Sequence, residues 1–302
     1  MELGWSIFTN NVLPAFIVIG IGVLLERRIA IDKRTLSRLA IYVLTPCLVF
    51  SSIVQSEVDP GQFGLMIAYV LVFTIVMCAI GLGVGRLLGW SRKATNALVL
   101  SIAFTNSGNL GLSIILFTFG QAGFGLAAAF FVATNLTTNT FAAFFAAHGR
   151  GTLRQTLIQV LKLPGIYAFA LALLLRGGPP LPQLVMRPIS LIAQAQIPIM
   201  LMMLGVQLSQ TKIGRQYKEI SLGVALRLIG GAAVALVLAP LMGLSGLARQ
   251  VAIAQSATPA AVSAALMAIE FDAEADYVAS VIFFSTLLSS ITLSVLLTFL
   301  VA

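Results

Sequence analysis

Long apolar runs separated by short polar segments dominate the pattern of hydrophobic and polar positions along the chain. Each run holds about 20 residues with few charges, which is the length that a helix needs to cross the hydrocarbon core of a membrane. The pattern predicts ten membrane-spanning helices. They are expected at residues 6–25, 36–55, 63–88, 94–118, 122–147, 156–175, 185–208, 217–242, 248–269 and 276–301.

The composition supports a multi-pass membrane protein and excludes an ordinary soluble domain. Of the 302 residues, 59% are hydrophobic and 9% are charged, and the mean hydropathy is +1.02. Soluble domains carry about 25% charged residues. The net charge of +8 does not indicate nucleic-acid binding, because nearly all the basic residues lie in short loops between the predicted spans.

The distribution of the basic residues predicts which side of the membrane each loop faces. Lys and Arg are concentrated in the cytoplasmic loops of membrane proteins. The odd-numbered loops between the predicted spans contain 14 Lys and Arg residues, whereas the even-numbered loops contain three. The odd loops are therefore predicted to be cytoplasmic, with both termini on the outer side of the cell membrane.

The two halves of the chain resemble each other. Each half contains five predicted spans, an odd number, so the second half must enter the membrane from the opposite side. The sequence predicts an all-helical protein built of two inverted repeats, residues 1–147 and 156–302, joined by a short cytoplasmic connector at 148–155. The segments 12–25, 45–55 and 87–96 match 162–175, 197–207 and 241–250, at offsets of 150, 152 and 154 residues.

The span at 94–118 is interrupted at its centre by the polar stretch TNSGNLG, which starts one residue before Asn106. Gly108 and Gly111 each destabilise a helix by about 1 kcal/mol relative to Ala. Asn109 tolerates left-handed backbone and carries amide hydrogen-bonding groups. An alternative interpretation is that the small residues only permit close packing of membrane helices. The presence of a second interruption at the equivalent position of the second half favours a true break in the helix.

The equivalent span of the second half, at 248–269, contains Pro259, which lacks a backbone N–H and clashes with the preceding turn. Non-helical backbone at membrane depth survives only where protein or a water-filled cavity covers it. Paired breaks in inverted repeats point to a transporter site near the middle of the membrane. Two half-helix N-termini, each with about half a positive charge, are expected to face one anion there.

Polar side chains also lie deep in the span at 122–147. Asn135, Thr138 and Asn139 are spaced at i, i+3 and i+4, so they share one helix face. Amides that face lipid would lose water without gaining partners. The three residues are predicted to line the site, with hydrogen bonding between helices as the alternative, and the repeat alignment places Ser289 opposite Asn135.

Milder interruptions occur in the second and seventh spans, where Pro46 follows Thr45 and where Pro198 stands at the equivalent position. Met200, Met202, Met203 and Gln207 lie farther along the seventh span, and the methionines offer a soft apolar wall. Two interpretations stay open for these residues: they line the site, or they belong to kinked helices that do not contact substrate.

One charged residue, Arg227, lies about 15 Å into the span at 217–242. It is predicted either to contact an anionic substrate or to extend back toward the cytoplasmic surface. The sequence indicates no metal ion and no cofactor. The residues predicted to bind substrate are Asn106, Gly108, Asn109, Gly111, Asn135, Thr138, Asn139, Gln255, Thr258, Pro259, Ser263 and Ser289, and those predicted to line the site from the second and seventh spans are Thr45, Pro46, Pro198, Met202 and Gln207.

Three stretches resemble the auxin efflux carrier family, in its short prokaryotic form, which is related to the bile acid/sodium symporters. They are LTPCLVFSSI in the second span, AFTNSGNLGLSII in the fourth, and AQSATPAAVSAALMAIEFDAEADYVASVIFFSTLLSSIT across the last two. The resemblance implies a scaffold of spans one, two, six and seven and a transport domain of spans three to five and eight to ten, which moves like an elevator. It also implies that an organic anion, such as an indole auxin, malate or malonate, binds beside Asn109 and Pro259.

The expected function is therefore a secondary carrier of a small mono- or dicarboxylate. The alternative is a sodium-coupled symporter of a larger amphipathic anion, in which Gln255 and Asn109 supply oxygen ligands. An intramembrane enzyme is disfavoured because the spans contain no nucleophile with a base and no metal cluster. Coupling to protons or sodium, and assembly of a homodimer through the scaffold, stay open at this point.

Overall fold

The chain is helical throughout the described residues, and its one extended pairing is a single bridge between Thr105 and Ala260. The predicted connector at 148–155 lies outside them. The computed structural model describes residues 2–29, 31–146, 163–270 and 272–301.

The helices follow the order α1 (Glu2–Ile7), α2 (Leu13–Arg28), α3 (Lys33–Leu39), α4 (Thr45–Val54), α5 (Pro60–Leu87), α6 (Arg92–Ala103), α7 (Leu112–Ala146), α9 (Pro164–Leu175), α10 (Gln183–Gln194), α11 (Gln196–Ser209), α12 (Tyr217–Ala225), α13 (Gly231–Leu241), α14 (Gly246–Ser256), α15 (Ser263–Glu270) and α16 (Ala275–Val301). Short π-helical segments connect several of them: η1 (Phe8–Val12), η2 (Ala40–Leu44), η3 (Ser107–Gly111) and η4 (Leu226–Gly230). Such segments are rare and often occur at functional sites.

Seven helical stretches among the described residues are long and apolar enough to cross a membrane. The predicted all-helical, multi-span class is confirmed, whereas the number ten and the inverted relation of the halves stay predictions. The difference concerns three predicted spans. The spans at 94–118 and 248–269 are divided into shorter helices, and the span at 156–175 is described only as α9, which has 12 residues.

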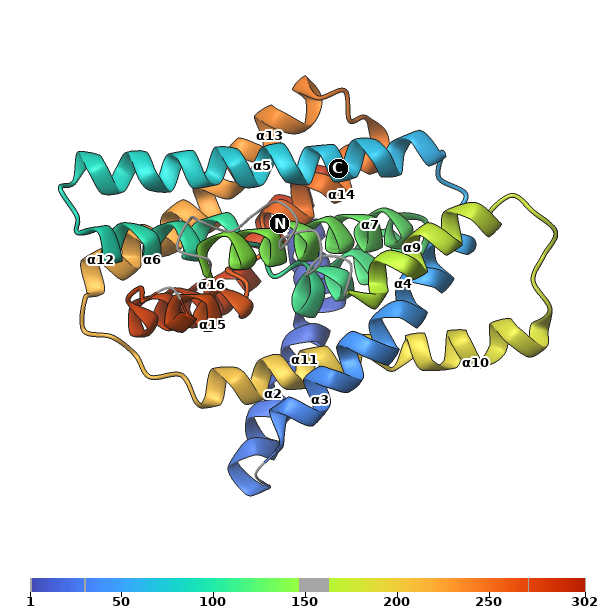
Figure 1. Ribbon diagram of the computed structural model, residues 1–302, viewed down its shortest axis with the longest axis horizontal. Coiled ribbons are helices and arrows are strands. Elements are labelled where there is room, and N and C mark those ends of the chain that lie inside the picture. Colours follow the sequence, from blue (N-terminus) through green and yellow to red (C-terminus); the bar gives the residue numbers. More distant parts are fainter. Residues whose placement is uncertain (1, 30, 147–162, 271, 302) are drawn as a thin grey trace.

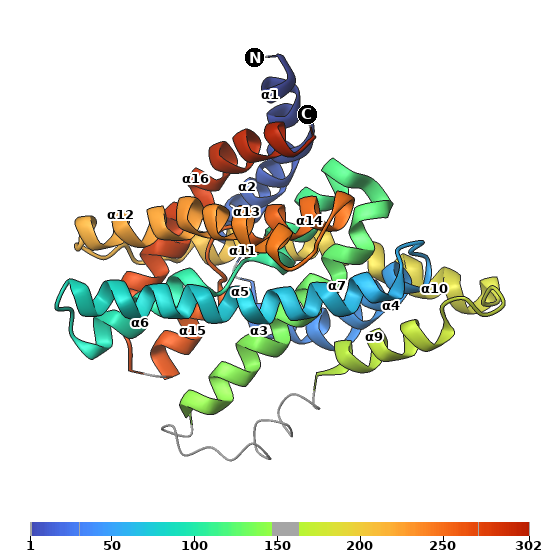
Figure 2. The ribbon, with the colours of Figure 1, turned by 90° about the horizontal axis from the view of Figure 1, so that it is seen from above.

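Helix α7 changes direction at Gly120 (Figure 2). The backbone of Gly120 has φ 60° and ψ −156°, a conformation that residues with a Cβ adopt only with strain. The sequence predicts the end of one span and the start of the next around this glycine. Helix α7 therefore holds the second half of the fourth predicted span and the whole described part of the fifth.

The helices pack into two groups. In the first group α2 packs along α11, and α4 packs against α9 and α10; in the second, α5 packs on α6 and α7, α14 on α13 and α7, and α16 on α12 and α15. Helices α2, α3, α10 and α11 lie in the lower part of Figure 1, and α5 and α13 lie in its upper part. The groups meet where α4 contacts α7 and where α11 contacts η3.

Two glycines allow α2 and α11 to approach each other closely. A Cβ atom on Gly22 would overlap the carbonyl group of Met202, and one on Gly205 would overlap the carbonyl oxygen of Ile19. Close packing of backbones through small residues is a main source of helix association in lipid, where the hydrophobic effect between helices is weak. This contact joins the two halves of the chain within the first group.

Candidate functional site

Both predicted interruptions are present, and the two broken segments contact each other. Helices α6 and α14 stop inside the protein, and the chain resumes as η3 and α15. Between these helices Asn106 donates its backbone N–H to the carbonyl oxygen of Pro259 at 2.8 Å, and Ala261 donates to that of Phe104 at 2.9 Å. The backbone groups freed by one break are thus satisfied by the other.

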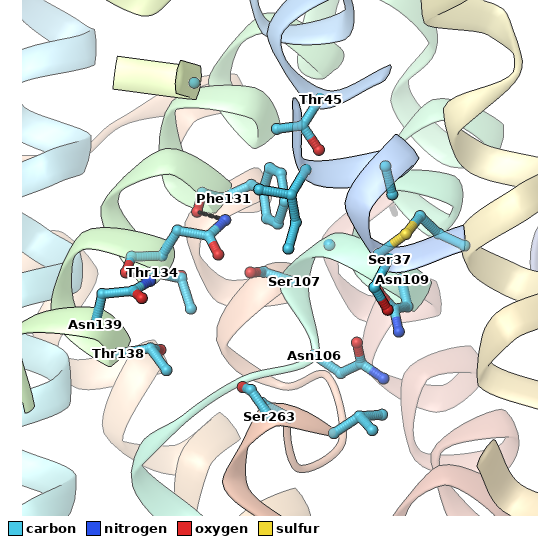
Figure 3. Close-up of a pocket in the computed structure, with 18 of the residues that line it drawn as sticks. Ser37, Thr45, Asn106, Ser107, Asn109, Phe131, Thr134, Thr138, Asn139 and Ser263 are labelled. Atoms are coloured by element: carbon cyan, nitrogen blue, oxygen red, sulfur yellow. Dashed lines mark hydrogen bonds between the residues drawn. The ribbon is translucent and has the colours of Figure 1, made fainter. Parts of the chain in front are cut away.

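Two helix N-termini begin next to this crossing. The segment η3 starts at Ser107, and α15 starts at Ser263. The N–H groups in the first turn of a helix have no partner within that helix and carry partial positive charge. Figure 3 shows Ser107, Asn106 and Ser263 around the same space, so amide donors from both halves of the chain converge there.

A cavity of about 280 Å³ lies against the crossing. Its walls come from η2 and α4, from the interrupted segments, from α7, from the start of α9 and from α11. None of its described lining residues is charged. The predicted site residues that line the cavity are Asn106, Gly108, Asn109, Asn135, Thr138, Asn139, Ser263, Thr45 and Gln207.

Three polar groups at the crossing are buried without a hydrogen-bond partner among the described residues. They are the Thr105 hydroxyl, the Asn106 amide nitrogen and the Ser107 hydroxyl, and all three residues are at most 4% exposed. Buried polar groups in folded proteins are almost always paired, so each exception needs an explanation. Because these three residues line the cavity, they are positioned to donate hydrogen bonds to a ligand.

Helix α7 forms the opposite wall, to the left in Figure 3. The amide nitrogen of Asn135 donates to the Phe131 carbonyl oxygen at 3.1 Å, and that of Asn139 donates to the Asn135 carbonyl oxygen at 2.8 Å. The Thr134 hydroxyl also bonds within its own helix: it donates to the Phe130 carbonyl oxygen at 2.9 Å. The two amide oxygens remain available to accept hydrogen bonds from a ligand.

The first group of helices contributes Thr45 to the cavity. Gln196 is fully buried at the start of α11, and its amide nitrogen donates to the Thr45 hydroxyl oxygen at 3.0 Å. A hydroxyl that accepts from an amide keeps its own proton free to donate. The contact also connects two helix starts that lie near the predicted prolines, because Pro46 is in the first turn of α4 and Pro198 is in the first turn of α11.

Several predicted site residues do not line the cavity. Gly111, Gln255, Thr258 and Pro259 belong to the crossing behind it, and Ser289 bonds to its own helix at the Thr286 carbonyl oxygen. Pro46, Pro198 and Met202 are likewise outside the lining, whereas Met203 and Met200, one and two residues from Met202 on the same helix, are part of it. For these three residues the interpretation as kinked or packing positions fits better than a lining role.

Gln255 is the most unusual of the residues behind the cavity. It is fully buried, and neither its amide oxygen nor its amide nitrogen has a partner among the described residues. A Cβ on Gly111 would overlap the amide oxygen of Gln255. Gly111 is thus required for space, because a larger residue would displace the Gln255 side chain.

Arg227 does not line the cavity, and it does not extend to the surface, because its side chain is 0% exposed. Its guanidinium lies behind the crossing and donates to carbonyl oxygens at the ends of α6 and α14. Neither predicted role for Arg227 matches this position. This role was not predictable from the sequence, because the two carbonyl groups come from segments far away in the chain.

The sequence reasoning also missed residues that the tertiary structure brings to the cavity. Ser37, Ile41, Phe131 and Leu266 line it. Ser37 and Ile41 lie near the start of the second predicted span, and Phe131 lies one turn before Asn135. The i, i+4 relation of Phe131 to Asn135 was the only available signal. Among the described residues, no three His, Cys, Asp or Glu side chains gather into a group that could hold a metal ion.

Comparisons with known proteins identify the family of the chain. The model of a family described as "Membrane transport protein" matches the chain twice in succession, over residues 7–149 and 147–297. A protein named "Uncharacterized transporter" from Methanothermobacter thermautotrophicus is 26% identical over 93% of this chain and 92% of its own length. An uncharacterized transporter from Methanocaldococcus jannaschii is 24% identical over 86% and 87%. The chain therefore belongs to this family of membrane transport proteins, the family of the auxin efflux carriers.

Proposed function

We propose that the protein is a secondary carrier that binds a small organic anion, such as a mono- or dicarboxylate, where the two interrupted helices cross. The observation that carries the proposal is the cavity at the crossing. Donors of both halves converge on it, including the unpartnered groups of Thr105, Asn106 and Ser107. Backbone amides at helix N-termini are effective anion-binding groups.

The chemistry of the walls matches a carboxylate better than a cation. A cation of an organic substrate would need carboxylates or an aromatic cage, and the described lining offers Phe131 as its single aromatic residue and no acidic side chain. A carboxylate placed at Ser107 and Ser263 would accept hydrogen bonds from both N-termini. The rest of the substrate would then contact Phe131, Met203 and the amide oxygens of α7.

The two groups of helices support an elevator-type movement. Both interrupted helices belong to the second group, whereas Thr45 and Met203 belong to the first, so a displacement of one group along the other would carry the site with it. The cavity has Ser37 and Leu163 on its lining, next to loops that the basic residues predict to be cytoplasmic. On the opposite side α4 packs against α7. We therefore assign the structure to an inward-open state.

Uptake by proteoliposomes tests the proposal. Purified protein should take up at least one of labelled acetate, benzoate, malonate and malate with saturable kinetics, and Asn109→Ala should lower the uptake rate at low substrate concentration by about tenfold. Asn10→Ala is the control, because Asn10 is exposed near the N-terminus and outside the cavity lining. Linear, non-saturating flux would indicate a channel, and an unchanged rate in Asn109→Ala would refute the site.

A second candidate is a sodium-coupled symporter of a larger amphipathic anion. The observation in its favour is the buried amide oxygen of Gln255, which has no partner among the described residues and is a ligand type that sodium accepts. Replacement of sodium by choline distinguishes the two functions. Uptake by a symporter would collapse in choline, whereas uptake by the uncoupled carrier would not change.

A further inference from the structure

Arg227 is a charged residue enclosed in the centre of the second group of helices. It lies in η4, its side chain is 0% exposed, and it is the largest of the fully buried side chains among the described residues. One guanidinium nitrogen donates to the Ile102 carbonyl oxygen at 2.5 Å, and another donates to the Ser256 carbonyl oxygen. A charge in this position requires compensating contacts, since an arginine in the middle of a membrane is costly to remove from water.

The two carbonyl groups supply these contacts, because both lie at helix ends where the crossing leaves carbonyl oxygens without a partner in their own helix. Ile102 is next to last in α6, and Ser256 is last in α14. Carbonyls in the last turn of a helix have no partner within it and carry partial negative charge. The amide that would continue α6, that of Asn106, donates to Pro259 instead, and the amide of Ala260 donates to the Ser285 hydroxyl. The guanidinium is therefore the partner of both helix ends.

An aromatic ring, two hydroxyl groups and a glycine surround the guanidinium. The Phe73 ring lies 5.8 Å from its central carbon, and the Tyr69 hydroxyl lies 2.9 Å from the Ser256 hydroxyl. A Cβ on Gly231 would be 2.6 Å from one of its nitrogens. No carboxylate pairs with Arg227 in the described part of the chain, where the single ion pair joins two exposed residues, Lys93 and Asp272.

We propose that Arg227 is a built-in cation that takes the place of a bound metal ion at the crossing. Converging carbonyl and hydroxyl oxygens at interrupted helices are the ligands that hold sodium in membrane carriers. Here the guanidinium occupies the carbonyls of Ile102 and Ser256 permanently. The inference rests on the proposed carrier function, and it makes the crossing stable and able to bind its anion without any inorganic cation.

Thermal unfolding of the purified full-length protein tests this role without any transported anion. The wild-type unfolding temperature should be the same in sodium chloride and in choline chloride at equal ionic strength. Arg227→Ala should unfold at least about 5 °C lower, because two buried carbonyl oxygens lose their partner. Methylguanidinium chloride, and to a smaller extent sodium chloride, should then raise the unfolding temperature of Arg227→Ala but not that of Arg227→Lys, which keeps its own charge.

A pair of glycine variants perturbs the guanidinium without removing it. Gly231→Ala places a methyl group against the Arg227 nitrogen, whereas a Cβ on Gly230 meets only the Leu226 side chain at 3.8 Å or more. Gly231→Ala should therefore unfold several degrees below Gly230→Ala. If Arg227→Ala does not fold, this pair of variants still tests whether the guanidinium stabilises the crossing. Equal unfolding temperatures of the two glycine variants would overturn the proposal.

Two further results would overturn it. One is a rise of the wild-type unfolding temperature by more than about 2 °C in sodium over choline. The other is an Arg227→Ala protein that is as stable as the wild type and indifferent to methylguanidinium. These outcomes are separate from the carrier function, because a protein that transports none of the tested carboxylates would still show the unfolding pattern, and a carrier stabilised by sodium would still transport.

Discussion

The backbone N–H of Asn106 lies 2.8 Å from the carbonyl oxygen of Pro259, although 152 residues separate them in the chain. This bond joins the two interrupted segments at their breaks. It leaves the Asn106 side chain free, with its amide nitrogen buried at the cavity and without a partner among the described residues. The backbone of Asn106 thus serves the fold, and its side chain is available for a ligand.

Asn106→Ala separates these two roles. The backbone bond to Pro259 persists, and the removed amide group had no partner, so the unfolding temperature without ligand should not fall. Affinity for the transported carboxylate should fall by about tenfold, which corresponds to about 1.4 kcal/mol for one lost hydrogen bond to a charged group. Thermal unfolding and substrate-dependent stabilisation measure the two effects on one sample. A loss of stability with unchanged affinity would contradict this assignment.

Gly108→Ala should obstruct the cavity through Phe131, because a Cβ on Gly108 would overlap the Phe131 ring. Transport by Gly108→Ala should therefore drop sharply, while Phe131→Leu, which shortens the side chain, should restore part of it in the double variant. The interaction between the two substitutions, measured as uptake rates in a double-mutant cycle, should exceed about 0.5 kcal/mol. Strictly additive effects would show that the two positions do not share the site.

Gly22→Ala should destabilise the contact between α2 and α11 by about 2 kcal/mol or more, because the new methyl group overlaps the Met202 carbonyl and the helices must separate. The matched control is Gly20→Ala in the same helix, since a Cβ on Gly20 meets nothing within 4 Å. That variant should be as stable as the wild type or slightly more stable. Equal unfolding temperatures for the two variants would mean that α2 and α11 are not in close contact.

A disulfide between Ser56, two residues after the end of α4, and Gly125 in α7 should arrest the carrier in the proposed inward-open state. A Cβ on Gly125 would be 2.8 Å from that of Ser56, so a shift of about 1 Å reaches disulfide geometry. In a background with Cys47→Ser and Cys78→Ser, the double variant Ser56→Cys and Gly125→Cys should lose uptake on oxidation and regain it on reduction. The single variants, treated alike, are the controls. Full activity of the cross-linked protein would argue against movement of α7 along α4.

Periodicity and composition predicted the helical, multi-span class, because helices satisfy their backbone groups internally and apolar runs of this length have few other stable forms in a membrane. The positions of the two interruptions were equally visible. Pro259 acts on its own segment through a missing donor, whereas Gly108 and Gly111 mark the other interruption but follow it, as part of η3. Such effects depend on residues close together in the chain, and the structure has one break just before Ser107 and the other around Pro259.

The site was predictable only in part, since its far wall depends on neighbours in space. Asn135 and Asn139 were found because they share a helix face. Met200, Met202 and Met203 were all expected to form an apolar wall, and the rotation of the helix leaves Met202 out of the lining while Met200 and Met203 belong to it. Ser37 gave no signal, as nothing in its own segment indicates which helix it will meet. Lining residues of this kind are set by packing between elements.

The sequence by itself determined that this protein spans a membrane, where its helices break, and to which family of transport proteins it is similar. Only the tertiary structure decided that Arg227 closes the carbonyl ends of α6 and α14, and that Gln196 orients Thr45 at the cavity. The physical reason is the range of the interactions. Helix formation and breaking depend on residues within a few positions of each other, whereas a buried charge or amide finds its partner wherever the packed helices bring an unpaired group within hydrogen-bond distance.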